Sequence, residues 1–415
     1  MARAMKDSGI EWIGKIPETW SILALKYLCS MQAGKNLFSE QIADDGDYPV
    51  YGGNGLRGYF NNFNYEGTKL LVGRQGALCG NVHRVNKKFW ATEHAIVTEN
   101  TDLCHINFLY YLLIGMNLNQ YVLSTAAQPG LAVSTIQNIR VCLPSLMEQI
   151  CIATFLDTEC ARIDAVIEQT RASIEEYKKL KQAVITQAVT KGIRPGRKMK
   201  DSGVEWIGEI PDEWEICRLR HIGSTQNGIS KSGEFFGEGY PFVSYGDVYR
   251  NMSLPHEVKG LVKSTEEEQE LYSVRKGDIF FTRTSETIEE VGFSSVCEQT
   301  IPKSTFAGFL IRVRPYDDTL DIGFSKYYFR SGHHRFYLVK QMNLVTRASL
   351  GQQLLKGMPV LVPNNAEQKE IAEYLDKMCS KYDRLISAKE TIISELETFK
   401  KSLIYEYVTG KKEVL

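Results

Sequence analysis

The sequence has no excess of charge of either sign. Its 49 lysine and arginine residues are balanced by 50 aspartate and glutamate residues, which gives a formal net charge of −1. Nucleic-acid-binding domains usually carry a basic patch or a basic overall composition. Composition therefore gives no bulk signature of DNA or RNA binding. Any such affinity has to come from local placement of arginine and lysine, or from partner chains.

Long apolar runs and paired cysteines are also missing. No segment approaches the roughly 18 apolar residues that span a bilayer, and no apolar stretch follows the basic residues near the N-terminus as in a secretory signal. The nine cysteines are scattered and never spaced as C-x-x-C, so neither a disulfide framework nor a zinc site is indicated. We therefore expect a cytoplasmic protein that has no membrane segment.

Motifs that carry chemistry are absent or poorly formed. The segment 235–239 (FFGEG) has the glycines of an S-adenosylmethionine loop but lacks the buried strand before them and the helix after them. No Asn-Pro-Pro-Tyr-type tetrapeptide, which grips a flipped adenine in amino-methyltransferases, is present. A G-x-x-x-x-G-K-S/T phosphate loop is absent too. We expect a chain that binds no cofactor and is not an enzyme. Turnover by the purified protein with S-adenosylmethionine or magnesium would contradict this.

What the sequence does contain is an internal repeat of two blocks. MKDSGIEWIGKIPETW at 5–20 recurs as MKDSGVEWIGEIPDEW at 199–214, and LPSLMEQICIATFLDTECARID at 143–164 recurs as VPNNAEQKEIAEYLDKMCSKYD at 362–383. The offset between copies grows from 194 to 219, so the stretch between the blocks is 25 residues longer in the second half. A shared framework with divergent inserts suits two similar modules that recognise different things.

The second block of each copy begins a long predicted helix, because neither proline nor glycine occurs in 148–190 and apolar residues recur at spacings of 4 and 7. Ser145 and Asn364 are available as N-caps, and Gly192 and Gly410 mark the ends. About forty residues make a rod of about 60 Å. Antiparallel packing of the two helices is the simplest way to bury the seam. The predicted interface residues are Ile152, Leu156, Ile163, Ile167 and Ile174 in the first helix and Ile371, Leu375, Tyr382, Ile386 and Ile393 in the second.

The inserts have the short apolar runs and the glycine and asparagine turns of mixed α and β domains. Strands are expected within 48–59, 68–73 and 95–98, then 241–245, 278–282 and 309–313, and helices around 107–113 and 325–330. The predicted fold class is therefore α+β. Two mixed α/β domains are separated by two long antiparallel coiled-coil helices, with a pseudo-two-fold internal repeat. The predicted boundaries are 1–143, 144–198, 199–362 and 363–415.

The inserts also carry polar clusters suited to reading DNA. In the major groove, arginine and lysine recognise guanine and asparagine and glutamine recognise adenine, while serine, threonine and backbone amides bind phosphates. The candidates are Asn54, Arg57, Arg74, Gln75, Asn81, His83 and Arg84 in the first insert and Tyr245, Arg283, Thr284, Ser285, Arg347, Ser349 and Gln352 in the second. The alternative is that these residues simply build surface loops.

With these blocks in this order, the sequence resembles the specificity subunits of type I restriction-modification enzymes. The pattern K-D-S-G-x-E-W-I-G-x-I-P-x-x-W at 6–20 and 200–214 is highly specific to that family, and the P-x-x-x-E-Q helix openings are typical of it. The resemblance covers the whole chain. The segment 67–98 is similar to a recurrent recognition-domain core, whereas 276–308 is similar only in outline. Different half-sites are therefore expected for the two domains.

The resemblance implies a division of labour. Each target-recognition domain, 1–143 and 199–362, reads one half of a bipartite double-stranded DNA site. The helical regions, 144–198 and 363–415, set the spacer and dock two adenine-N6 methyltransferase subunits, which bind S-adenosylmethionine. Restriction subunits, where present, use ATP and magnesium. The alternative is a coiled-coil protein-interaction scaffold without sequence-specific DNA binding, whose DNA affinity would depend neither on salt nor on sequence.

Overall fold

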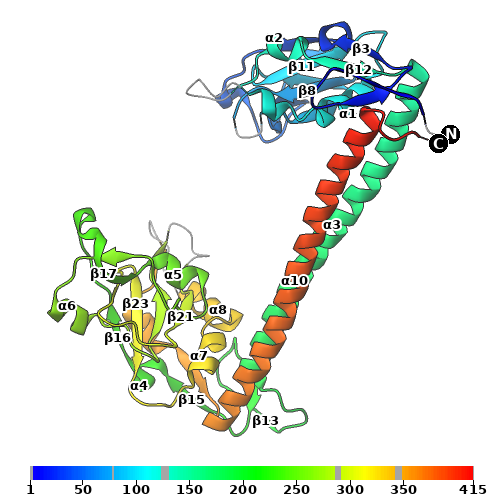
Figure 1. Ribbon diagram of the computed structural model, residues 1–415. Helices are drawn as coiled ribbons and strands as arrows, with labels where there is room; N and C mark the ends of the chain where they lie inside the picture. The colour runs from blue at the N-terminus through cyan, green and yellow to red at the C-terminus, as the bar shows by residue number, and fades with distance from the viewer. Residues whose placement is uncertain (1–2, 77–78, 123–129, 286–290, 342–347, 415) are drawn as a thin grey trace. The chain divides into compact units, whose positions relative to one another are not determined.

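The computed structural model describes residues 3–76, 79–122, 130–285, 291–341 and 348–414. The chain packs into two compact units. Unit 1 contains 1–171 and 390–415, and unit 2 contains 172–389. Each unit holds one mixed domain and parts of two long helices, α3 (Leu146–Lys191) and α10 (Asn365–Val408), which are labelled in Figure 1. Because the division passes through both helices, the four boundaries expected from the sequence stay a prediction.

The domain of unit 1 is built mainly from two four-stranded sheets. Its elements are β1 (Met5–Asp7), β2 (Lys15–Pro17), β3 (Ser21–Ala24), β4 (Cys29–Ala33), β5 (Tyr48–Gly52), β6 (Gly55–Phe60), β7 (Tyr65–Glu66), β8 (Lys69–Gly73), β9 (Val82–Val85), β10 (Lys88–Ala91), β11 (Ala95–Asn100), α1 (Ile106–Gly115), α2 (Val133–Gln137) and β12 (Arg140–Leu143). The sheets have the orders β4-β11-β8-β9 and β6-β5-β10-β7. The first is antiparallel throughout, and α1 packs against β8, β9 and β11.

The domain of unit 2 repeats the larger part of this arrangement. Its elements are β13 (Met199–Asp201), β14 (Glu209–Pro211), β15 (Glu215–Arg218), α4 (Leu219–Ile222), β16 (Gly223–Asn227), β17 (Phe236–Val243), α5 (Tyr245–Arg250), β18 (Leu261–Val262), α6 (Glu266–Leu271), β19 (Ile279–Thr282), β20 (Thr284–Ser285), β21 (Ser294–Val296), β22 (Thr305–Phe306), β23 (Leu310–Pro315), α7 (Ile322–Tyr328), α8 (Gly332–Gln341), β24 (Ala348–Ser349), α9 (Gln352–Gly357) and β25 (Pro359–Val362). The sheet β16-β23-β19-β21 corresponds strand for strand to β4-β11-β8-β9. The longer second insert holds α5, β18 and α6 between β17 and β19, where unit 1 has only β6 and β7.

Most of the expected elements are confirmed. The segment 48–59 forms the hairpin β5–β6, the other apolar runs form β8, β11, β19 and β23, and α1 and α7 are the two expected helices. One strand was expected to extend too far, because β17 ends at Val243 and Tyr245 begins α5. The Ser244 hydroxyl accepts from the Asp247 amide at 3.3 Å, and the Asp247 carboxylate accepts from the Ser244 amide at 2.8 Å. This capping box starts a helix where the strand was expected to continue.

In each unit the two repeated sequence blocks are joined by the same hydrogen bond. The Trp20 indole N–H donates to the Glu148 carboxylate at 3.0 Å, and the Trp214 indole N–H donates to the Glu367 carboxylate at 3.1 Å. Both glutamates lie in the first turn of a long helix. The two blocks recur together because the last residue of one binds the opening turn of the other.

The glutamine that follows each of these glutamates holds the domain to the long helix. The side-chain oxygen of Gln149 accepts from the His105 amide at 2.7 Å, and that of Gln368 accepts from the Asp321 amide at 2.7 Å. His105 and Asp321 are the N-cap residues of α1 and α7. Gln149 and Gln368 are themselves buried. They therefore satisfy backbone groups that the start of a short helix leaves unpaired.

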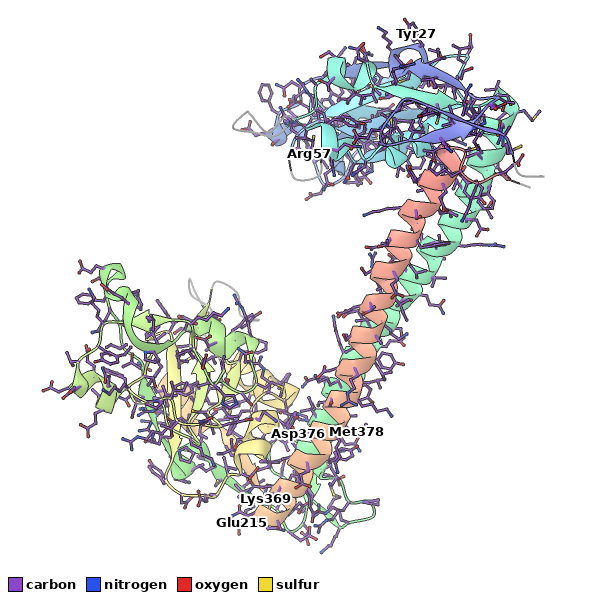
Figure 2. All side chains as sticks on the ribbon, viewed as in Figure 1. Tyr27, Arg57, Glu215, Lys369, Asp376 and Met378 are labelled. Atoms are coloured by element: carbon purple, nitrogen blue, oxygen red, sulfur yellow. The ribbon has the colours of Figure 1, made fainter. Side chains whose placement is uncertain are left out.

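About two turns further along each long helix, a repeated aspartate makes a second matching contact. Asp157 on α3 accepts from the Tyr111 hydroxyl at 2.8 Å, and Asp376 on α10 accepts from the Tyr327 hydroxyl at 2.6 Å. Figure 2 labels Asp376 on α10. Together with the glutamine contacts, these bonds align α1 with α7, an alignment that the diverged insert sequences do not give.

The long helices begin as expected and pack against each other within each unit. Ser145 and Asn364 cap their first turns. In unit 1 the partners run antiparallel, with Asp164 bound to Lys400 at 2.6 Å and Arg171 to Glu397 at 3.1 Å. In unit 2, Lys181 binds Asp383 at 2.6 Å and Tyr177 contacts Tyr382. Among the predicted seam residues, Ile152, Leu156, Ile163, Ile167, Ile174, Ile371 and Leu375 are buried and Tyr382, Ile386 and Ile393 are half-buried. No helix in the described ranges is apolar enough over a sufficient length to cross a membrane.

An ion pair between neighbouring strands occurs at the same place in both units with its charges exchanged. Lys69 and Glu99 at the ends of β8 and β11 lie 3.1 Å apart. At the matching positions beside β19 and β23, Asp278 and Arg314 lie 2.6 Å apart, with Asp278 buried. Both units therefore keep an ion pair at this place, although the positive and the negative residue have exchanged strands.

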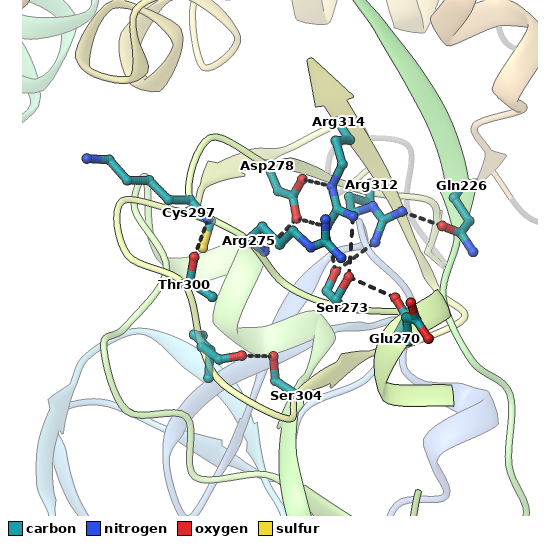
Figure 3. Close-up of polar contacts among 12 residues, drawn as sticks. Gln226, Glu270, Ser273, Arg275, Asp278, Cys297, Thr300, Ser304, Arg312 and Arg314 are labelled. Atoms are coloured by element: carbon teal, nitrogen blue, oxygen red, sulfur yellow. Dashed lines mark hydrogen bonds and ion pairs between the residues drawn. The ribbon is translucent and has the colours of Figure 1, made fainter. Parts of the chain in front are cut away.

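Unit 2 also buries an arginine beside this pair. Arg312, 5% exposed, takes the place of Val97, and its guanidinium donates to the Ser273 carbonyl at 2.7 Å and to the Gln226 side chain. Figure 3 shows these groups converging with Arg314 and Asp278. Burial lowers the pKa of Arg312 to about 10. The network ties β16 and β23 to the segment that follows α6.

Candidate nucleic-acid interface

In unit 1, the predicted DNA-contacting residues come from the end of β8, the turn between β5 and β6, and β9. Arg74 and Gln75 directly follow β8, and Asn54 lies in the tight turn between β5 and β6. That turn packs closely against the end of β8. A Cβ added to Gly53 would lie 2.8 Å from the His94 carbonyl oxygen and 3.5 Å from the Gly73 Cα. Only glycine permits this approach.

The same hairpin contributes an exposed arginine. Arg57, on β6, is exposed and is labelled at the surface of the first domain in Figure 2. Gly55, at the start of β6, lies against the ring of His83, since an added Cβ would lie 3.4 Å from that ring. The structure thus brings Asn54, Arg57, Arg74 and His83 to neighbouring positions. Their contacts with DNA stay a prediction.

The residues of β9 separate into two groups. The Asn81 carbonyl, just before β9, accepts from the Gly73 amide at 2.8 Å, which places Asn81 beside the end of β8. Burial lowers the pKa of His83, which favours its neutral imidazole over the cation. Arg84 is not brought together with this group. Its guanidinium binds Asp157 on α3 at 3.0 Å, because adjacent strand residues point to opposite faces.

In unit 2, two strands bring the separated candidates together. Thr284 on β20 pairs with Ser349 on β24, and Ser285 follows Thr284 on β20. The Leu350 amide donates to the Arg283 carbonyl at 2.7 Å, so Arg283 lies beside the same strand pair. Arg347 lies outside the described residues.

Two further candidates of unit 2 are held by their neighbours. The Gln352 side chain accepts from Thr225 at 2.7 Å and donates to Asn227 at 3.0 Å, which fixes it to β16. The Tyr245 ring stacks on that of Tyr249 in α5, with centroids 6.0 Å apart. Gln352 is thus part of the sheet edge near Asn227, and Tyr245 is part of an aromatic row on α5.

Arg74 and Arg283 occupy equivalent backbone positions. Each directly follows the third strand of its sheet, and its amide donates to the carbonyl of the residue that directly precedes the second strand. Arg74 donates to His94 at 2.9 Å, and Arg283 donates to Phe309 at 2.8 Å. We call this arrangement the recognition frame. The cluster around Arg74 in the first domain and the cluster around Arg283 in the second domain therefore occupy the same place in the fold.

A third segment completes the recognition frame in both units. The Arg74 carbonyl accepts from the Leu131 amide at 2.9 Å, and the Arg283 carbonyl accepts from the Leu350 amide at 2.7 Å. Both backbone groups of each arginine are therefore bound, which fixes the origin of a long side chain. The sequence gives no local signal of this pairing, because the partners lie far along the chain.

Sequence reasoning did not place His94 and Phe309 at this interface. His94 lies between Gln75, with Nδ1 and Oε1 2.9 Å apart, and Glu93, with Nε2 and Oε1 3.1 Å apart. Phe309 is 64% exposed. Their only signal in the sequence is their place directly before a buried apolar strand.

The sequence matches the family described as Type I restriction modification DNA specificity domain, at residues 17–176 and 211–398. Among known relatives, the type I restriction enzyme EcoprrI specificity subunit from Escherichia coli is 41% identical over 148 residues, which is 35% of this chain and 37% of that subunit. The MjaVIII specificity subunit from Methanocaldococcus jannaschii is 22% identical over 421 residues, covering 96% of this chain and 94% of that one.

The fold is also found among solved structures. One chain, from work described as the structural basis of complex assembly and conformational transition of the type I R-M system, has a TM-score of 0.71 at 15% identity, with 96% of this chain and 99% of that chain covered. This likeness concerns the fold, two domains of mixed helix and strand content. Because the family match occupies two segments that together exceed half of the sequence, the chain belongs to the type I restriction-modification DNA specificity family.

Proposed function

We propose that this chain selects a bipartite DNA site and that each domain reads one half of it. The observation that carries the proposal is the recognition frame, which occurs twice with an arginine at the same position, Arg74 in one domain and Arg283 in the other. An arginine held at both of its backbone groups suits bidentate recognition of guanine O6 and N7. The residues around the two arginines differ, so the half-sites differ.

The surrounding candidates supply the rest of the contact surface. Asn54 and Arg57 on the hairpin offer hydrogen bonds to bases or phosphates of the first half-site, and the His83 ring lies beside this hairpin. Thr284 and Ser349 flank Arg283 for the second half-site. Since the chain has a formal net charge of −1, these local contacts and the partner subunits provide the attraction to DNA.

The long helices set the spacer between the half-sites and dock two adenine-N6 methyltransferase subunits. Half-sites read from one face of DNA lie about 34 to 36 Å apart, and 46 helical residues in α3 have a length of about 69 Å. Inserting one heptad into both α3 and α10 keeps the seam and adds about 10 Å. The methylated motif should then keep its bases and gain spacer. An unchanged spacer would contradict this role.

In this proposal the chemistry resides in the partners. The methyltransferase subunits bind S-adenosylmethionine, and restriction subunits, where present, use ATP and magnesium. This chain binds no cofactor and catalyses no step, and it acts in the cytoplasm. Family membership and the sequence relatives named as specificity subunits support this division.

The test is single-molecule sequencing of adenine methylation in cells that express this chain with its methyltransferase subunit, compared with cells that express the methyltransferase alone. A bipartite motif that requires this chain gives both half-sites and the spacer. If the complex forms and no new motif is present, the proposal fails and the interaction-scaffold alternative gains support. In vitro, DNA binding should weaken steeply with salt and depend on sequence.

A further inference from the structure

The chemistry beside the two recognition arginines is opposite in character. In the first domain, His94 is flanked by the polar side chains of Gln75 and Glu93. In the second domain, strand registers place Phe309 where the first has His94, and Gly308 where it has Glu93. An imidazole among polar groups is thus replaced by a phenyl ring that follows a glycine.

Gly308 lies in tight surroundings. A Cβ added there would lie 2.4 Å from the Ser230 Oγ and 3.2 Å from the Ile229 carbonyl oxygen, so a larger residue would have to displace the Ser230 side chain and press on the Ile229 backbone. Its carbonyl lies 3.5 Å from Nη1 of Arg283. Because Gly308 and Phe309 are consecutive, the exposed ring begins one residue away from the group that touches the arginine.

The position of Phe309 is fixed even though its ring is exposed. Its carbonyl accepts from the Arg283 amide at 2.8 Å, and Leu310, which follows it, is fully buried in β23. The ring, 64% exposed, is therefore presented on a rigid backbone beside the proposed guanine-binding arginine. In the major groove, the apolar feature that distinguishes base pairs is the thymine C5-methyl group, and phenylalanine is one of the side chains that contact it.

We propose that Phe309 and His94 are equivalent specificity-determining residues. Phe309 selects thymine at the base pair next to the one bound by Arg283, through contact with the C5-methyl group. At the corresponding place in the first domain, the polar group formed by His94, Gln75 and Glu93 takes the position of this ring, so no preference for the thymine methyl group is expected there. This inference rests on the proposed function and names one base of the second half-site by its chemistry.

The test removes one methyl group at a time. The purified complex with its methyltransferase subunit is bound to DNA of the wild-type motif in which each thymine of the second half-site is replaced singly by uracil, which lacks only the C5-methyl group. At one position, uracil should weaken binding of the wild-type complex about fourfold, the effect of one buried carbon group. Phe309→Ala should bind thymine and uracil equally there. Phe309→Leu, the matched control, should keep part of the preference for thymine.

Three results would overturn the inference: a second half-site without thymine, uracil effects that are the same in wild type and Phe309→Ala, or a Phe309→Ala variant that loses methyltransferase binding but keeps its DNA preference. The last would place Phe309 at a protein interface. Retention of the first half-site in the variant's methylation motif shows that it folds. A wild-type complex that yields no bipartite motif would instead refute the proposed function, and this inference with it.

Discussion

The junction between the repeated blocks gives a prediction with an internal control, because the same glutamate is buried in one unit and half-buried in the other. The side chain of Glu367 is 0% exposed and binds Arg197, which is 11% exposed. The side chain of Glu148 is 27% exposed and binds Arg3 at 2.7 Å. Breaking a buried ion pair costs about 3 to 5 kcal/mol because an uncompensated charge remains, whereas a solvated pair contributes about 0 to 1 kcal/mol.

Glutamine preserves the size of the side chain and one acceptor oxygen for the indole N–H, so it removes chiefly the charge. Glu367→Gln should therefore lower the free energy of unfolding of unit 2 by about 3 kcal/mol, and Glu148→Gln should lower that of unit 1 by about 1 kcal/mol or less. Urea denaturation followed by hydrogen exchange and mass spectrometry reports on each unit through its own peptides. Equal losses for the two substitutions would refute the reasoning that burial decides the strength of this contact.

Three further predictions concern the domains. Arg74→Ala and Arg283→Ala should each weaken binding at one half-site by about 1 to 3 kcal/mol in competition assays, and an equal loss on all sequences would mark a phosphate contact. Burial lowers the pKa of His334 from 6.5 to about 3, so the unfolded chain binds a proton that the folded chain does not. Unit 2 should thus lose about 2 kcal/mol of stability between about pH 7 and about pH 5, and a His334→Gln variant with the same pH slope would contradict this. Asp278→Asn should destabilise unit 2 by about 3 kcal/mol in urea titrations, and Asp278→Lys with Arg314→Glu, the arrangement of unit 1, should recover part of that loss; no recovery would show that the exchanged pairs are not equivalent.

The repeated blocks made the architecture predictable. Helix starts at Ser145 and Asn364 are visible because a capping residue stands before a long stretch free of proline and glycine. Buried strands such as β8 and β19 are visible because they are short apolar runs next to glycines or charged residues. These signals are local. They predicted the element correctly where no capping motif nearby favoured a different structure. At Tyr245 such a motif did compete, since Ser244 and Asp247 start a helix.

The site was harder to predict because its geometry depends on contacts between distant segments. Arg74 and Arg283 are 209 positions apart, an offset that matches neither repeated block, because the second insert holds α5, β18 and α6 before β19 where the first has only β6 and β7 before β8. Neighbours in sequence also separate in space. His83 lies with the candidate interface, whereas Arg84 points to α3 and binds Asp157.

The contacts that join each insert to the repeated blocks have a consequence for inheritance. At the joints through Gln149 and Gln368, an insert contributes backbone amides, which every residue but proline provides, and at Asp157 and Asp376 it contributes a tyrosine hydroxyl. The protein segments 5–20 and 199–214 are nearly the same, so an insert that is moved from one copy of the framework to the other meets the same joints. Under the proposed function, genetic exchange of a whole insert would give a new DNA target in one step, without refining a domain residue by residue.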